Sequence, residues 1–174
     1  LIQQAAEAGY SYAQNYMGKA YRFGWNVKVN PVRATNWFTK AAEQNLPDAM
    51  CNLGDMYSAE DGLTVDYEKA LYWYGKAAEA NHYRALTELG DLYYAGKGVE
   101  RDFAKALEYY LKACDEGYPY AFYSVGFMYL RGQGTAPNRE KAMEYLSQAA
   151  AMGNESAFQL LNQICLLYTS PSPR

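Results

Sequence analysis

The 174-residue sequence predicts an all-α protein, a right-handed α-solenoid of helix-turn-helix repeats that are 36 residues long. Three observations predict this class. Equivalent residues return every 36 positions without a gap, apolar residues inside each unit follow the helical period, and residues that favour helix ends stand at the same places in every unit. A single helical hairpin cannot bury both of its faces, so we expect consecutive units to stack.

The repeat is visible as columns of like residues. We expect four complete units, at 10–45, 46–81, 82–117 and 118–153, between the end of a preceding unit at 1–9 and the start of another at 154–164. The columns that define the period are Ala13, Ala49, Ala85, Ala121 and Ala157; Gly18, Gly54, Gly90 and Gly126; and Tyr21, Tyr57, Tyr93 and Tyr129.

The first helix of each unit is predicted by an apolar stripe. In the third unit, Ala85, Leu89 and Leu92 follow the helical period. Gly90 lies inside the same helix, where glycine costs about 1 kcal/mol relative to alanine. We therefore expect a neighbouring helix to approach closely at the glycine column.

The second helix of each unit is predicted by its ends. The expected N-cap residues have side-chain oxygens that can accept bonds from exposed N–H groups, and they are Asn30, Asp66, Asp102 and Asn138. The expected C-terminal caps are residue types that tolerate a left-handed backbone, and they are Gly9, Asn45, Asn81, Gly117 and Gly153. Pro31 agrees with a helix start, because its missing N–H would be unpaired at the first helical position.

The stretch ALTELGDLYYAGKGVERDFAKALEYYLKACDEG at 85–117 resembles the Sel1-like repeat, a relative of the tetratricopeptide repeat. The shared core L-G-x-x-Y occurs as LGDMY at 53–57 and LGDLY at 89–93, and the longer interhelical loop as GKGVERD at 96–102. The resemblance implies an α-solenoid scaffold and no particular chemistry. Two loop positions depart from the pattern: Asn26 still tolerates positive φ, whereas Glu60 predicts a rearranged loop.

Composition and charge argue against several function classes. Sixteen basic and 19 acidic residues leave a net charge of −3, so we expect no nucleic-acid partner. No apolar run approaches the roughly 18 residues of a membrane-spanning helix, so we expect no membrane segment. His82 is the only histidine, and the three cysteines lack metal-ligand spacing, so we expect no metal, cofactor or catalytic triad. Some secreted Sel1-like proteins carry one disulfide per repeat, but Cys51 and Cys114 lie in different units.

The residues expected to meet a partner form one stripe along the first helices. We call positions 12, 15, 19 and 22 and their equivalents the groove stripe, because a solenoid of this kind presents this face to its groove. The expected partner-binding residues are Tyr12, Asn15, Lys19, Arg22, Asp48, Asp55, Arg84, Asp91, Tyr94, Tyr120, Tyr123 and Phe127. Charges would steer and register a peptide, and the aromatic side chains of the fourth unit would anchor it. The open alternative is a solvated charged face, with the aromatic side chains packed under a following repeat.

The expected function is a non-catalytic adaptor of bacterial type that binds a peptide or protein in its concave groove; its localisation is undetermined. An alternative is a docking or regulatory segment of a larger enzyme or membrane-anchored protein. A remote alternative is a hydrolase that uses Asp55 and Asp91, which the repeat places roughly 10 Å apart, near the carboxylate separation of inverting glycosidases. Repetition alone explains their alignment, so we expect no enzyme.

The two ends of the sequence indicate a piece of a longer array. The sequence begins without methionine, and the tyrosine column next predicts tyrosine where Cys165 stands. The final CLLYTSPSPR follows no column and matches what a transposase-type sequencing adapter would encode in frame. We therefore expect 165–174 to be a non-native tail.

Overall fold

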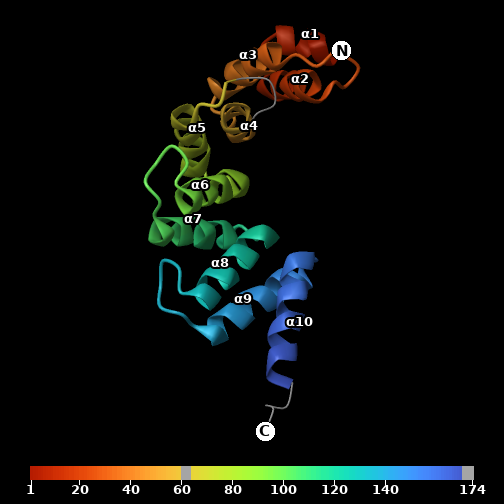
Figure 1. Cartoon of the computed structure of the whole chain (residues 1–174). Coiled ribbons are helices and arrows are strands. Elements are labelled where there is room, and N and C mark those ends of the chain that lie inside the picture. Colours follow the sequence, from red (N-terminus) through yellow and green to blue (C-terminus); the bar gives the residue numbers. More distant parts are fainter. Residues whose placement is uncertain (60–63, 170–174) are drawn as a thin grey trace.

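The computed structural model describes residues 1–59 and 64–169, with side chains up to residue 166. This described part is all-α, as predicted, with ten helices and no strand. The helices follow one another along a curved array, with α1 at one end and α10 at the other (Figure 1). They are α1 (Ile2–Glu7), α2 (Ser11–Phe23), α3 (Pro31–Ala42), α4 (Pro47–Ser58), α5 (Tyr67–Glu79), α6 (Tyr83–Ala95), α7 (Phe103–Asp115), α8 (Pro119–Arg131), α9 (Arg139–Ala151) and α10 (Glu155–Thr169).

The helices pack in consecutive pairs. The two helices of a unit, such as α6 and α7, pack on each other, and each second helix packs on the first helix of the next unit. The first helices α4 and α6 also touch directly. Small side chains allow this close packing. Two alanine columns are fully buried, and they are Ala34, Ala70, Ala106 and Ala142, and Ala41, Ala77, Ala113 and Ala149.

The glycine column marks a close approach, as the sequence predicts. A Cβ atom added to Gly90 would lie 2.5 Å from Cε1 of Tyr110, on the second helix of the same unit. The equivalent atom on Gly54 would lie 2.4 Å from the ring of Tyr74. A distance under 3 Å is too short for any real carbon contact, so the side chain on the second helix takes the space that a Cβ would need. Gly18 and Gly126 meet the same kind of obstacle, formed by Phe38 and Leu146.

The predicted caps are confirmed at both ends of the second helices. Asn30, Asp66, Asp102 and Asn138 each accept a side-chain hydrogen bond from the backbone N–H three residues later. The predicted C-terminal caps all have positive φ: Gly9, Asn45, Asn81, Gly117 and Gly153. Asn26 also has positive φ, at 57°, as expected. The loop rearrangement predicted at Glu60 lies outside the described residues.

The tyrosine column closes the interhelical loops. In the third unit, the carbonyl of Tyr93 accepts a 2.9 Å hydrogen bond from the N–H of Asp102, and Nζ of Lys105 lies 4.3 Å from the centroid of the Tyr93 ring. The ring quadrupole attracts a cation placed over its face. The same contact occurs in the other units between Arg33 and Tyr21, Lys69 and Tyr57, and Lys141 and Tyr129. These tyrosines therefore stabilise each hairpin.

The last helix continues the array beyond the fourth unit. Ala157 and Ile164 of α10 are buried together with Leu146 and Ala149 of α9. Residues 165–169 extend this helix, and the remainder of the segment expected to be non-native lies outside the described residues. None of the described helices is both long and apolar enough to span a membrane.

Candidate functional site

One column of the groove stripe lies in the interior. Asn15 is only 7% exposed, and its Oδ1 accepts a 2.8 Å hydrogen bond from Nδ2 of Asn52 on the next first helix. Cys51 and Thr87, which occupy equivalent positions, are also buried. The prediction that Asn15 faces the groove is therefore wrong. Consecutive first helices pack so closely that these three residues lie between them, whereas Tyr123 at the fourth position of this column is only partly buried.

The stripe residues at the N-terminal end remain apart from one another. Tyr12 is 75% exposed, and Lys19 is half-buried on the same helix. Asp48 of α4 is exposed and lies 3.5 Å from Nε2 of His82, whose pKa is lowered by burial. None of these three stripe residues lines the aromatic cavity described below.

The middle of the stripe is a network of paired charges. Asp55 Oδ2 lies 2.9 Å from Nη1 of Arg22 on α2 and 3.0 Å from Nη2 of Arg84 on α6. Arg84 also donates a 2.9 Å hydrogen bond to Asn52 Oδ1. Partial burial strengthens these contacts relative to fully exposed ion pairs. Asp55 thus connects three successive first helices, α2, α4 and α6.

The next carboxylate along the stripe has different partners. Asp91 accepts hydrogen bonds from the hydroxyl of Tyr110 and from that of Tyr120, whose oxygen lies 3.3 Å from Oδ1. Among the ion pairs of the described residues, none involves Asp91. Burial raises the pKa of this carboxyl group, and the two hydroxyl donors act in the opposite direction.

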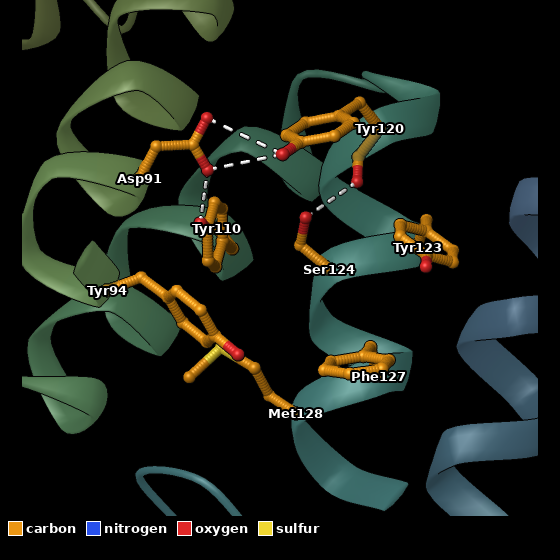
Figure 2. Close-up of a pocket in the computed structure, with 8 residues that line it drawn as sticks. All are labelled: Asp91, Tyr94, Tyr110, Tyr120, Tyr123, Ser124, Phe127 and Met128. Atoms are coloured by element: carbon orange, nitrogen blue, oxygen red, sulfur yellow. Dashed lines mark hydrogen bonds between the residues drawn. The ribbon is translucent and has the colours of Figure 1, made fainter. Parts of the chain in front are cut away.

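A cavity of about 190 Å³ opens beside this carboxylate. We call it the Asp91 pocket. Figure 2 shows its wall residues, which come from α6, α7 and α8, with Asp91 directed toward Tyr120 across the gap between α6 and α8. The lining is mostly aromatic, and it consists of Asp91, Tyr94, Tyr110, Tyr120, Tyr123, Ser124, Phe127 and Met128.

The aromatic side chains of the pocket are partly accessible. Tyr120 is 40% exposed, and the Tyr94 hydroxyl donates a 3.1 Å hydrogen bond to Gln133. The rings of Tyr123 and Phe127 have centroids 6.2 Å apart. Tyr123 also packs against the buried cluster of α9 and α10, so part of this residue is covered by the following helix, as the alternative interpretation expected.

The structure therefore brings together five of the predicted residues, Asp91, Tyr94, Tyr120, Tyr123 and Phe127. Sequence reasoning missed three further wall residues, Tyr110, Ser124 and Met128; Tyr110 and Met128 lie in apolar repeat columns that are typical of the core, and Ser124 lies outside the groove stripe. One sequence feature could have identified Tyr110 as a wall residue, namely a carboxylate and a tyrosine at a fixed spacing. Tyrosine stands 19 residues after the carboxylate at the third stripe position in both units that have one there, as Tyr74 after Asp55 and Tyr110 after Asp91.

The two carboxylates of the remote hydrolase alternative occupy unlike environments. Asp55 is bound by two guanidinium groups and the Tyr74 hydroxyl, whereas Asp91 is bound by two tyrosine hydroxyls. The described residues contain no group of three or more His, Cys, Asp or Glu side chains arranged to hold a metal ion. Each carboxylate thus has a structural role that repetition and packing explain.

Comparison with protein families gives the class of this array. The family model of the Sel1 repeat matches four segments, at 11–46, 47–82, 84–118 and 119–154. The chain belongs to the Sel1 repeat family. Sel1 repeat proteins are generally protein–protein interaction scaffolds, and the fold is typically non-catalytic. Among curated proteins, no match to the chain was found.

Solved structures of Sel1 repeat proteins superpose on the chain. A protective antigen of uropathogenic Escherichia coli gives a TM-score of 0.89 at 32% identity, over 94% of this chain and 35% of the antigen. A Sel1 repeat protein from Oxalobacter formigenes gives a TM-score of 0.81 at 33% identity, over 94% of this chain and 48% of that protein. An immunity protein from Pseudomonas aeruginosa gives a TM-score of 0.61 at 28% identity, over 90% of this chain and 58% of the immunity protein. The chain thus spans about a third of the length of the Escherichia coli antigen and about half of the length of the Oxalobacter protein. These relatives are bacterial, which favours a bacterial origin for the chain.

Proposed function

We propose that this Sel1 repeat chain is a non-catalytic adaptor that holds an extended segment of a protein partner along the first helices, with the Asp91 pocket as the anchor. The observation that supports this most directly is the pocket itself, because it combines aromatic walls with a carboxylate and remains partly open. Buried aromatic anchors surrounded by polar rims supply most of the binding energy in protein interfaces.

The rest of the groove stripe has a different role in this proposal. Arg22, Asp55 and Arg84 pair with one another, so they hold the units in register rather than bind the partner. The exposed side chains of Tyr12 and Asp48 would contact a partner at the edge of the interface, where contacts contribute little energy. Affinity should therefore depend on the fourth unit.

A selection from a library of random linear peptides displayed on phage tests the proposal. We expect peptides that bind the chain and lose roughly tenfold or more in affinity to Tyr120→Ala, since an interface anchor commonly contributes at least that much. The matched control is Tyr72→Ala, because Tyr72 is a 57% exposed tyrosine on α5 and does not line the pocket. Circular dichroism and urea unfolding verify that both variants fold.

The proposal is contradicted if the selection yields no peptide that distinguishes Tyr120→Ala from the unaltered chain. Peptides that depend on Tyr72 instead would place the binding face on the second helices. Either result would remove the first-helix groove as the binding surface.

A further inference from the structure

The Asp91 pocket deepens the proposed function, on which this inference rests, because it indicates what kind of side chain the anchor binds. Asp55 and Asp91 occupy equivalent positions on consecutive first helices, 36 residues apart. Both accept a hydrogen bond from a tyrosine on the second helix of their own unit, Tyr74 or Tyr110. A main difference between the two environments lies in what the adjacent units provide.

Around Asp55, the adjacent units provide two guanidinium groups. Arg22 comes from the unit before and Arg84 from the unit after, at 2.9 and 3.0 Å from Oδ2. The positions equivalent to these arginines around Asp91 are Ser58 and Tyr120, and neither is a cation. The Ser58 hydroxyl is bonded to the hydroxyl of Tyr74, at 2.9 Å.

Asp91 is therefore a half-buried carboxylate without the guanidinium groups that its counterpart has. The cation whose charge lowers the pKa of Asp91 is Lys97, which is exposed and lies 5.8 Å from the centroid of the Tyr67 ring. Glu88 on the same helix interacts with both Asp55 and Asp91, and burial together with these two charges raises the pKa of Glu88 to about 7. A partly buried anionic site of this kind is stabilised by an incoming cation.

The walls of the cavity suit one cation in particular. The guanidinium group is planar, is more weakly hydrated than an ammonium group, and stacks on aromatic faces. Tyr120 contacts the carboxylate directly, and Tyr94 and Tyr123 line the same cavity. The Phe127 ring already has the guanidinium of Arg131 at 5.3 Å from its centroid, so we expect the tyrosine rings to receive the second guanidinium group.

We propose that the Asp91 pocket receives the side chain of an arginine from the bound partner segment, whose guanidinium group pairs with Asp91 and stacks on the tyrosine rings. The partner arginine would take the place that Arg84 and Arg22 take around Asp55. The partner would thus provide for Asp91 the arginine–carboxylate pair that the chain itself provides for Asp55 across its first three units.

Peptides from the phage selection on the unaltered chain test this assignment directly. We expect them to share an arginine, and synthetic copies in which citrulline replaces that arginine should bind roughly tenfold or more weakly, because citrulline keeps the shape and removes the charge. On Asp91→Asn, the arginine and citrulline peptides should bind equally weakly. Glu100→Gln is the control, since Glu100 is an exposed carboxylate in the loop after α6, outside both the groove stripe and the pocket.

A second variant tests the site by the stability of the chain as well as by peptide binding. Tyr120→Arg places arginine at the position equivalent to Arg84, so it should raise the urea midpoint of unfolding and remove the preference for arginine over citrulline peptides. An unchanged or lowered midpoint, together with an unchanged peptide preference, would show that Asp91 does not accept a guanidinium group.

The outcomes separate this inference from the proposed function. Peptides that need Tyr120 but tolerate citrulline, or contain no arginine, overturn the arginine site and leave the groove in place. Peptides with no dependence on Tyr120 overturn both. A lysine copy that binds as tightly as the arginine peptide contradicts the choice of guanidinium over ammonium.

Discussion

The hydroxyl of Tyr74 donates a 3.0 Å hydrogen bond to Oδ1 of Asp55, which lies 19 residues earlier on the first helix of the same unit. Tyr110 and Asp91 repeat this bond in the third unit. Where the stripe position is Lys19 or Phe127, the position 19 residues later is Phe38 or Leu146, which have no hydroxyl. The tyrosine–carboxylate hydrogen bond therefore occurs in the two central units, where a partly buried carboxylate needs a hydrogen-bond donor.

Replacing Tyr74 by phenylalanine should destabilise the chain. The Tyr74 hydroxyl bonds both Asp55 and Ser58, and the residue is only 1% exposed. Loss of hydrogen bonds to a half-buried carboxylate should lower the free energy of unfolding by about 1–2 kcal/mol. Urea unfolding followed by circular dichroism measures the change.

Tyr72→Phe serves as the matched control for this prediction. Tyr72 is exposed on the same helix, so removal of its hydroxyl should change the free energy of unfolding by less than about 0.5 kcal/mol. Equal effects of Tyr74→Phe and Tyr72→Phe would contradict a specific role for the bond to Asp55.

Gly90→Ala should destabilise the array although alanine favours helices. The new Cβ would lie 2.5 Å from the Tyr110 ring, and such overpacking commonly costs about 1–3 kcal/mol. Gly75 lies in helix α5 with no atom within 4 Å of an added Cβ, so Gly75→Ala should instead stabilise by up to about 1 kcal/mol. The midpoints of thermal and urea unfolding should thus fall for Gly90→Ala and rise for Gly75→Ala. A rise for both variants would show that helix propensity, and not packing against Tyr110, decides the stability of Gly90→Ala.

Glu88→Gln should change how stability depends on pH. Burial and the carboxylates of Asp55 and Asp91 raise the pKa of Glu88 from 4.5 to about 7. Because the folded form holds this proton more tightly than the unfolded form, the contribution of Glu88 is fully present below about pH 4.5 and is lost as pH rises through about 7. Relative to the unaltered chain, Glu88→Gln should therefore gain roughly 1–3 kcal/mol between pH 4.5 and pH 8.

Urea unfolding at several pH values measures this difference, and Glu100→Gln is the control because Glu100 is exposed in the loop after α6. The difference between unaltered chain and Glu100→Gln should stay nearly constant with pH. If Glu88→Gln behaves in the same way, Glu88 does not hold its proton in the folded chain.

The thiols should differ in reactivity. Burial raises the pKa of Cys51 and of Cys114 to about 12, whereas Cys165 is exposed on α10. The thiolate is the reactive form, so a disulfide reagent at neutral pH should label Cys165 quickly in the folded chain and the other two only after unfolding. Absorbance of the released thiol counts the reacting groups; fast labelling of a second thiol under native conditions would mean that the array opens locally.

Local features of single units could be read from the sequence. A cap depends on one side chain and the N–H groups next to it, which is why Asp102 and Gly117 were assigned correctly. The glycine column predicted a close helix approach, but the sequence did not identify the Tyr110 ring as the obstacle at Gly90. That ring comes from a helix whose rotation is decided by packing against the next unit.

The sequence by itself determined the repeat, the helix ends and the set of side chains that the first helices could present to a partner. Only the tertiary structure decided which of them remain available. Consecutive first helices lie close enough to bury Asn15 against Asn52 and to bring Arg22 and Arg84 onto Asp55. Asp91 instead accepts hydrogen bonds from two tyrosine hydroxyls beside an aromatic cavity. The physical reason is that helical periodicity sets the face of one helix, while contact between units depends on the separation and rotation of neighbouring helices, which the whole packed array sets.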